Sequence, residues 1–377
     1  MDLHDIGVYM TGSRRLIVDP CVQNAIAEFK LPTTLGFGKI LAPIMYEACY
    51  SEHCWGAGHL KPYGPIALAP CAKVLHYAQT LFEGMKAYRV DEDQTTLFRP
   101  LKHWERMVAS GKRLCMPELP QEIFMEGVNV VASCCEPYIP DQSGQMLYLR
   151  PFMFGTEATL GLGVSDTYSF VVVASPSDVY HTGTMRVLIE REEIRAAGML
   201  GSAKAGSNYA ASIYGSARAK QMGCDQPLWL DPFTRQNIEE LSGMNFFAVI
   251  DGALHTPALS GSFLPGITRD SVIILGRSLG YEVVERVMPA EQLLEDIRTG
   301  RCTEAFATGT AAVICSISEI SEEDGTALAL KEVPGPVAQK IRQELVDIQE
   351  GRKEDLFGWV TKVPLSHRSD RQPPPKG

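Results

Sequence analysis

Apolar and polar residues alternate along this chain with two different periods, which predicts a protein built from both helices and strands. Short apolar runs bounded by turn residues are typical of strands and fall at 147–152, 168–173, from about 185, 226–230, 244–250 and 252–256. Apolar residues at helical spacing are typical of amphipathic helices and fall at 103–114, 121–135, 209–222, 268–280, 290–299 and 337–349. The fold class that these patterns indicate is mixed α/β.

Turn-forming residues mark the boundaries between these elements. Residues 84–90 and 95–99 flank an acidic turn and predict a hairpin. Near the midpoint, Ser175 to Asp178 and His181 to Thr184 are rich in turn formers, which predicts a linker between two domains. A chain of 377 residues is long enough for two separate cores. The predicted division is 1–175, a connecting loop at 176–186, 187–365, and a disordered, proline-rich tail at 366–377.

Composition narrows the class of protein. A net charge of −10 without a Lys/Arg cluster argues against nucleic-acid binding. No apolar run approaches the ~18 residues of a membrane span, and the acidic start, Met1 to Asp5, is unlike a signal peptide. The ten cysteines form no Cys-x-x-Cys pair, and no histidine pair has zinc spacing, so no metal site is predicted. Reduced thiols, and hence a cytoplasmic protein, are expected.

Lys204 has the most informative surroundings of any residue in the chain. It lies within Gly201-Ser202-Ala203-Lys204-Ala205-Gly206-Ser207-Asn208-Tyr209, with no other charged side chain nearby. If this segment is buried, desolvation lowers the pKa of the amine and makes it a nucleophile for carbonyl groups. Taken alone, the same segment favours a flexible Gly/Ser loop that happens to carry a lysine.

Three further segments of the second half could supply parts of a cofactor site, although each by itself is more typical of an ordinary turn. Leu264 to Arg269 places a Pro-Gly turn before a helix, and the free N–H groups of a helix N-terminus favour phosphate. Thr308-Gly309-Thr310 is a second turn that can present amides and hydroxyls to an anion. Glu239-Glu240 could place a carboxylate against a protonated ring nitrogen. Pyridoxal phosphate needs a lysine, a phosphate cup and such an acid.

The order and wording of the motifs resemble those of branched-chain amino acid aminotransferases. The resemblance runs from about Leu35 to Trp359. It rests on Leu81-Phe82-Glu83-Gly84-Met85-Lys86-Ala87-Tyr88, Leu97-Phe98-Arg99-Pro100 with Arg106-Met107, Tyr148-Leu149-Arg150-Pro151, Lys204 to Tyr209, Gln226 to Asp231, Met244-Asn245, Leu264 to Arg269 and Thr308-Gly309-Thr310-Ala311. It implies a fold type IV pyridoxal phosphate enzyme that forms a homodimer, with a small N-terminal α/β domain and a larger pseudo-barrel domain.

The resemblance also implies a role for individual residues. Lys204 would form the Schiff base with pyridoxal phosphate and move the substrate's Cα proton. Cofactor contacts are implied for Arg106, Tyr209, Glu240, Ile267, Thr268 and Thr310. Glu240 would face the pyridine nitrogen and Tyr209 the phenolic oxygen, and the others would hold the phosphate. Substrate contacts are implied for Tyr77, Phe82, Tyr148, Arg150, Tyr180, Gly243 and Ala311.

Two departures from the family pattern fall where the substrate side chain is selected. Gly243 stands where the family commonly has threonine, and Leu41 where it usually has phenylalanine. Both changes would enlarge a pocket, and a methylene or ring edge is worth ~1–3 kcal/mol of discrimination. Cys315 lacks the cysteine partner found in some animal members, since Ala312 takes its place.

The predicted function is transamination between a branched-chain or related hydrophobic L-amino acid and 2-oxoglutarate, by a ping-pong cycle. An alternative is an aminotransferase of a specialised biosynthetic pathway that acts on a bulkier or non-standard substrate. Two further alternatives within the fold are a D-amino acid aminotransferase and an aminodeoxychorismate lyase, against which the Phe82 to Tyr88 wording argues. A non-catalytic binding protein on the same scaffold is the alternative from another class. The hydrolase-like Gly276-Arg277-Ser278-Leu279-Gly280 falls at a predicted helix end and is taken as chance.

Overall fold

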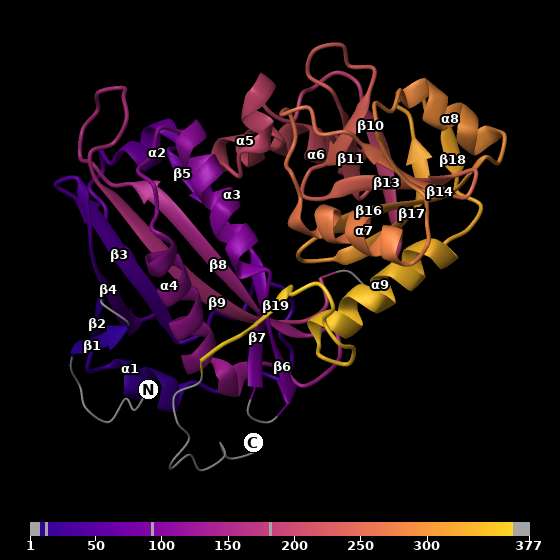
Figure 1. Ribbon diagram of the computed structural model, residues 1–377. Coiled ribbons are helices and arrows are strands. Elements are labelled where there is room, and N and C mark those ends of the chain that lie inside the picture. Colours follow the sequence, from indigo (N-terminus) through magenta and orange to yellow (C-terminus); the bar gives the residue numbers. More distant parts are fainter. Residues whose placement is uncertain (1–7, 12–13, 92–93, 181–182, 365–377) are drawn as a thin grey trace.

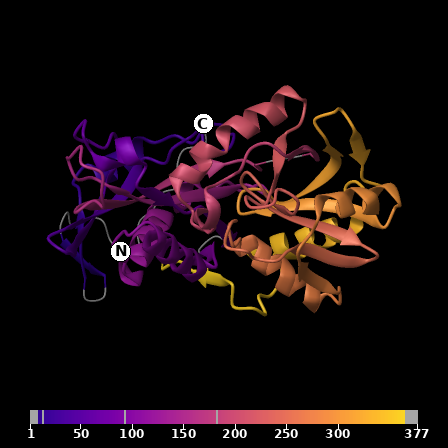
Figure 2. The same ribbon diagram turned by 90° about the horizontal axis from the view of Figure 1, so that it is seen from above.

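The computed structural model describes residues 8–11, 14–91, 94–180 and 183–364, which form two lobes, each built on one β-sheet (Figure 1). The view from above shows the same two lobes side by side, with helices of both halves between and around them (Figure 2). The first sheet comes mainly from the first half of the chain and the second sheet from the second half.

The first sheet has ten strands and is largely antiparallel. Its order is β1 (Val8–Thr11), β2 (Arg14–Val18), β4 (Cys54–Pro62), β3 (Ile44–Ser51), β9 (Tyr168–Ser177), β8 (Met146–Gly155), β6 (Met85–Asp91), β7 (Gln94–Phe98) and β19 (Val360–Lys362), with β5 (Thr80–Phe82) paired to β8. Successive side chains of a strand point to opposite faces. On β8, Leu147 and Leu149 therefore enter the core beneath the sheet, while Tyr148 and Arg150 share the other face.

The second sheet has nine strands and closes on itself. Its order is β12 (Ile238–Leu241), β11 (Gln226–Leu230), β10 (Met185–Glu190), β17 (Val313–Ser321), β16 (Cys302–Gly309), β13 (Asn245–Ile250), β14 (Ala253–Pro257) and β15 (Val283–Arg286), with β18 (Ala327–Ala329) paired to β17. A further pairing between β12 and β13, at Glu240 and Asn245, joins the two sides of the sheet into a barrel-like ring. The ring confirms the predicted fold class.

Helices cover both sheets. They are α1 (Val22–Glu28), α2 (Lys73–Tyr77), α3 (Pro100–Arg113), α4 (Gln121–Cys134), α5 (Gly206–Ala211), α6 (Ile213–Gln221), α7 (Ile267–Ser278), α8 (Ala290–Arg298) and α9 (Pro336–Gln349), with 3-10 turns at Glu136–Tyr138 and Gly198–Ser202. On β13, Phe246 packs in one core with α8, while Phe247 packs in another with α7 and α9. This explains why β13 reads as a continuous apolar run, since both of its faces are buried.

The predicted elements recur with small shifts and one break. The helix expected over 209–222 is two helices, α5 and α6, which begin at Gly206 and are interrupted at Ser212. The Ser212 hydroxyl donates to the Tyr209 carbonyl at 2.9 Å, and such a local bond competes with the helical ladder. Gly223 follows α6 with φ +76°, the left-handed conformation expected of a C-terminal cap.

The crossing between the sheets lies after Ser177, where β9 ends, and before Met185, where β10 begins. Near the end of the described chain, β19 returns to the first sheet and pairs with β7, as the yellow segment in Figure 1 shows. The division of the chain into domains stays a prediction, and its tail, 366–377, lies outside the described residues. Among the described helices, none is long and apolar enough to cross a membrane.

Candidate active site

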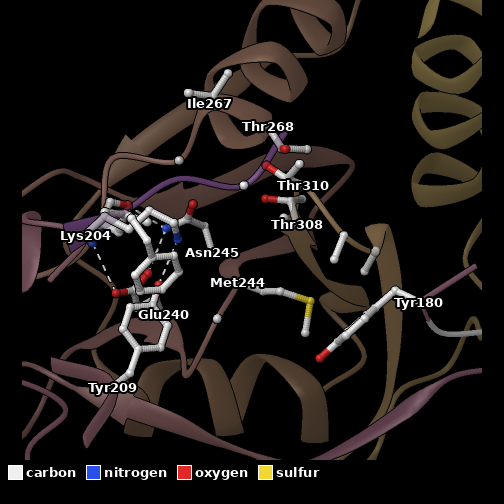
Figure 3. A pocket seen from close by; sticks show the side chains of 18 of the residues that line it. Tyr180, Lys204, Tyr209, Glu240, Met244, Asn245, Ile267, Thr268, Thr308 and Thr310 are labelled. Carbon is white, nitrogen blue, oxygen red and sulfur yellow. Dashed lines mark hydrogen bonds between the residues drawn. The ribbon is translucent and has the colours of Figure 1, made fainter. Parts of the chain in front are cut away.

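A cavity of about 190 Å³ lies where the two lobes meet, and it gathers nearly all the predicted site residues. Of the residues proposed from sequence, the following line it: Phe82, Arg106, Tyr148, Arg150, Tyr180, Lys204, Tyr209, Glu240, Gly243, Ile267, Thr268, Thr310 and Ala311. The close-up in Figure 3 shows Lys204, Tyr209 and Glu240 at one end and three threonines at the other.

Lys204 is held by its backbone on a short connection between the 3-10 turn Gly198–Ser202 and α5. Its N–H donates to the Ser110 hydroxyl at 2.9 Å, and its carbonyl accepts from the Phe82 N–H at 3.1 Å. The next residue, Ala205, bridges to Leu81. The backbone of the lysine segment is therefore hydrogen-bonded to β5 of the first sheet. These contacts exclude the interpretation of the segment as a flexible loop.

The small residues around Lys204 are required by close packing. A Cβ added to Gly201 would lie 1.5 Å from the Ser262 carbonyl oxygen, and one added to Gly206 would lie 2.8 Å from Thr80. Both glycines therefore let the lysine segment lie directly against its neighbours. The run of small residues seen in the sequence reflects this packing.

The Lys204 side chain is half-buried and engages one hydroxyl. Its Nζ donates to the Tyr209 hydroxyl oxygen at 2.8 Å and lies 4.8 Å from the centroid of the Phe82 ring. The Phe82 and Tyr209 rings are themselves 4.8 Å apart. The two aromatic rings thus fix the position of the amine, and among the described residues no carboxylate lies within hydrogen-bond or ion-pair distance of it.

Glu240 lies at the same end of the cavity on β12 and is fully enclosed. It accepts from the Leu264 N–H at 3.1 Å and from Asn245 Nδ2 at 3.1 Å, and its Oε1 lies 2.7 Å from Arg195 Nε. Burial raises the pKa of Glu240 to about 7, against the opposing charge of Arg195. A carboxyl with this pKa can share a proton with a ring nitrogen near neutral pH.

The other end of the cavity is built to receive an anion. The helix α7 begins at Ile267 and Thr268, and its free N–H groups and dipole favour negative charge. The end of β16 brings Thr308 beside them and the turn that follows brings Thr310, as Figure 3 shows. The Thr308 hydroxyl oxygen is buried and has no hydrogen-bond partner in the described chain, so it is left for a ligand.

Arg106 reaches this anion end from α3 and is held by a buried carboxylate. Its Nε and Nη2 donate to the two oxygens of Glu83 at 2.7 and 2.8 Å, and its Nη1 donates to the Pro265 carbonyl at 3.2 Å. His103 Nδ1 lies 2.7 Å from the same carboxylate. Burial alone would raise the pKa of Glu83, but Arg106 and His103 hold it well below its usual range.

Aromatic and cationic side chains from the first sheet form the remaining wall. Arg150 lies 4.7 Å from the centroid of the Phe82 ring, and its Nη2 donates to the Tyr148 hydroxyl at 3.2 Å. Phe37 packs edge-on against Tyr148 and Tyr180, at 4.9 and 4.8 Å between centroids. Arg150 Nε is buried and unpartnered among the described residues, so this wall offers one cation to a carboxylate.

One predicted substrate residue, Tyr77, lies away from the cavity. It ends α2 on the surface, and its hydroxyl donates to the Leu160 carbonyl. Leu41 does not line the cavity either, whereas Phe37, a few residues earlier, does. Gly243 does line it, and a Cβ added there would meet no atom within 4 Å, so the cavity wall is open at this position.

Comparison with known proteins identifies the family of this site. The model of the amino-transferase class IV family matches residues 80–320, which include every residue from Phe82 to Ala311 discussed above. The chain belongs to the class IV aminotransferase family.

Named relatives of this class IV aminotransferase are of the branched-chain type. The branched-chain-amino-acid aminotransferase of Mycolicibacterium smegmatis is 40% identical over 338 residues, which cover 87% of this chain and 92% of that protein. Branched-chain-amino-acid aminotransferase 2 of Bacillus subtilis is 38% identical over 337 residues, which cover 88% and 93%. These findings confirm the predicted family.

Solved structures agree with this assignment. The branched-chain aminotransferase of Thermoproteus uzoniensis with norvaline has a TM-score of 0.69 and 27% identity, covering 84% of this chain and 99% of that one. The enzyme of Thermobaculum terrenum in its PLP form also scores 0.69, at 26% identity, covering 86% and 99%. The predicted fold type IV and pyridoxal phosphate cofactor are thereby confirmed.

The residues of this class IV aminotransferase fit that cofactor. A phosphate would be held by the N-terminus of α7, the hydroxyls of Thr268, Thr308 and Thr310, and Arg106. The free Thr308 hydroxyl is the observation that tests the fit, since a buried hydroxyl without a partner is rare. The ring would lie between Lys204 and the buried acid Glu240.

Sequence reasoning missed several residues that support this site. They are Phe37, Glu83, His103, Arg195 and Gln226. Glu83 lies within the Leu81 to Tyr88 motif, but nothing in that motif indicates that the carboxylate pairs with Arg106. Arg195 carries no local signal, because its partner Glu240 is distant in sequence.

Proposed function

We propose that this enzyme transfers an amino group from a hydrophobic L-amino acid to 2-oxoglutarate in two half-reactions. The observation that carries the proposal is the hydrogen bond from the Lys204 amine to Tyr209, opposite the anion-binding turns and beside Glu240. Pyridoxal phosphate, when bound, supplies a carbonyl that condenses with amines and a pyridinium ring that withdraws electrons.

Lys204 is the group that removes and returns the proton at the substrate Cα. Its amine lies among aromatic rings, and no carboxylate of the described residues pairs with it, so it is free to act as a base. Tyr209 accepts from it at 2.8 Å and so aims it across the cavity. The phenol also lies where it can bond the cofactor's phenolic oxygen, as the family resemblance implies.

Glu240 keeps the ring nitrogen protonated. The carboxyl is buried on β12, and a charge on it is favoured by Arg195 and disfavoured by burial. A cation formed on the ring nitrogen would add to Arg195 and favour the carboxylate. The acid therefore holds a proton on the ring, where it stabilises negative charge that develops at Cα.

Arg150, Tyr148 and the turn at Thr310 to Ala311 hold the substrate carboxylates. Among the described residues the buried Nε of Arg150 has no hydrogen-bond partner, and the turn lines the same cavity. The aromatic wall of Phe37, Phe82 and Tyr180 excludes water from the side-chain end of the substrate.

A homodimer completes the proposal. An exposed apolar ridge runs over α2 and the neighbouring loop, and includes Leu75, Tyr77, Leu160, Leu162 and Val164. Exposed apolar patches of this kind mark protein interfaces. Analytical ultracentrifugation should show a dimer, and Leu162→Glu should dissociate it. A monomeric wild-type chain would contradict this part.

An amino-donor screen with 2-oxoglutarate tests the reaction. Leucine, isoleucine, valine, methionine and phenylalanine are compared by glutamate formation, with the Lys204→Ala variant as the blank. Turnover of at least one hydrophobic donor, with none in the blank, supports the proposal. A cofactor-loaded wild-type enzyme that forms no glutamate from any donor would overturn it.

The open space at Gly243 favours a second candidate, an enzyme for bulkier donors. No atom lies within 4 Å of a Cβ placed there, so the cavity is wider at this point than with threonine. The same screen separates the candidates. A preference for phenylalanine or methionine over leucine supports the second, and a preference for the aliphatic trio supports the first.

A further inference from the structure

Lys86 is a second lysine near the anion end, and the proposed reaction gives it no role. It lies on β6 and only 3% of its surface is exposed. Within the described chain, no hydrogen bond or ion pair involves its amine. Burial, followed by the charge of Arg342, lowers the pKa of Lys86 to about 7, against the opposing effect of Glu350. A buried ammonium without a partner is costly, so such a residue calls for an explanation.

A small cavity connects this lysine with the anion-binding turns. It measures about 10 Å³, room for roughly one water molecule, and its lining includes Lys86, His103, Thr268, Thr310 and Gln349. Thr268 and Thr310 also line the main cavity. The two turns that would hold a phosphate therefore separate two cavities. The main cavity is where the anion would bind, and we call this place the phosphate seat. The small cavity, with Lys86, lies on the other side of the turns.

The charge at the seat explains why a second cation is needed there. Glu83 accepts from two nitrogens of Arg106, so this ion pair carries almost no net charge. The N-terminus of α7 supplies roughly half a positive charge. A phosphate monoester carries between one and two negative charges at neutral pH, since its second pKa is about 6. The described seat is therefore short of positive charge for a dianion.

Three other titratable groups around Lys86, namely His103, Glu350 and Tyr88, have partners of their own. His103 of α3 contacts Glu83, and burial lowers its pKa. On α9 and after it, Arg342 and Glu350 act on Lys86 with opposite signs, and Glu350 pairs with Arg352. Tyr88 donates to Gln349, and burial raises its pKa. Of this set, Lys86 is the group that can change its charge near neutral pH.

We propose that Lys86 is the second cation of the phosphate seat, acting from behind the turns through the small cavity. When a dianion binds in front, the Lys86 amine takes up a proton from solvent and balances the charge, either directly or through one water. In the absence of an anion, burial favours the neutral amine, which reduces the cost of its burial. The assignment of the anion as the cofactor's phosphate rests on the proposed function, but the charge response does not.

Calorimetry of anion binding to the cofactor-free enzyme tests this inference. Inorganic phosphate and sulfate are titrated at pH 8 in two buffers that differ in ionisation enthalpy, which gives the number of protons taken up. Sulfate does not titrate in this range, so any proton must come to the protein. Wild type should take up most of one proton per bound sulfate.

Three variants assign that proton. Lys86→Met should abolish the uptake and weaken phosphate binding roughly tenfold, because it removes a nearby charge. Lys86→Arg should keep the affinity and lose the uptake, because arginine is always charged. Lys102→Met, an exposed lysine paired with Glu105, should behave as wild type.

Two outcomes would overturn the inference. One is unchanged uptake and affinity in Lys86→Met, and the other is uptake that persists in Lys86→Arg, which decides the matter if the methionine variant does not fold. Neither result would change the outcome expected of the amino-donor screen, which tests the proposed function. Conversely, a wild type that shows the proton uptake but transaminates no donor would contradict only the proposed function.

Discussion

The Lys204 amine donates a 2.8 Å hydrogen bond to the Tyr209 hydroxyl, and both groups come from one short stretch of chain at the start of α5. The dashed line in Figure 3 shows this contact. The chain just before and at the start of that stretch is held by the bridge of Ala205 to Leu81 of β5 and by the 3.2 Å hydrogen bond from the Ser202 N–H to the Gly261 carbonyl, which together fix where α5 begins. This pair is therefore the fixed point from which the site can be tested.

Removing either partner should separate chemistry from cofactor binding. Lys204→Ala should abolish turnover by at least about a thousandfold, because it removes the base, and should also remove the visible absorbance of the bound cofactor. Tyr209→Phe should keep the absorbance and lower kcat by roughly 10–100-fold, since only a hydrogen bond is lost. Steady-state kinetics and absorption spectra check both. Circular dichroism verifies that the folds are unchanged, and turnover in Lys204→Ala would exclude the role given to the lysine.

Glu83 should act on cofactor binding through Arg106. Glu83→Gln leaves a buried guanidinium without its carboxylate, and breaking such a pair costs about 3–5 kcal/mol of folding free energy. The misplaced Arg106 should also weaken pyridoxal phosphate binding, by roughly tenfold or more. Chemical denaturation and fluorescence titration of the cofactor-free protein measure the two effects.

A matched control for Glu83 lies on α3. Glu105 pairs with Lys102 on the surface, and an exposed pair contributes only about 0–1 kcal/mol. Glu105→Gln should therefore leave stability and cofactor affinity near their wild-type values. Equal behaviour of the two glutamine variants would show that the buried carboxylate does not position Arg106.

Gly243 should set the size of the accepted donor. Gly243→Thr adds bulk at the cavity wall, where the first added atom, the Cβ, would have no neighbour within 4 Å. Bulky donors should then lose kcat/KM by roughly 10–200-fold relative to leucine, the range for a methylene-sized change in a pocket. The ratio of kcat/KM for phenylalanine to that for leucine is the measurement. A ratio that stays constant in Gly243→Thr would show that this position does not select the side chain.

Site residues that lie close together in the sequence could be predicted from local motifs. Contacts between residues that are far apart in the sequence could not. Lys204, Tyr209 and the Thr308 to Thr310 turn are local motifs, and the structure gathers them in one cavity. The contact of Arg195 with Glu240 joins a residue of the loop after β10 to one on β12, and the order β10-β11-β12 in the second sheet brings these distant parts of the sequence together. Their side chains leave no periodic signal.

Tyr77 and Leu41 show a different limit of prediction from sequence. The family resemblance suggested a place for both near the substrate, yet neither lines the cavity. Tyr77 lies on the surface, where its hydroxyl donates to the Leu160 carbonyl. Phe37, and not Leu41, lines the cavity wall. Two hydrogen bonds between Gly36 and Asp178, one of them to the Asp178 carboxylate, hold the backbone next to Phe37. The fold itself was easier to predict, because strand and helix periods persist over many residues while each side-chain contact rests on one.

Glu240 should make the stability of the cofactor-free protein depend on pH. Its pKa is raised to about 7 in the folded chain, from 4.5, so the folded state keeps a proton that the unfolded state releases between these values. The free energy of unfolding should therefore fall as pH rises from about 4.5 to 7, by about 3 kcal/mol from this group. Glu240→Gln cannot titrate, so its stability should lack this fall, while the neighbouring Glu239 is common to both proteins. Urea denaturation of both at pH 5, 6, 7 and 8 measures the difference, and parallel curves would contradict the raised pKa.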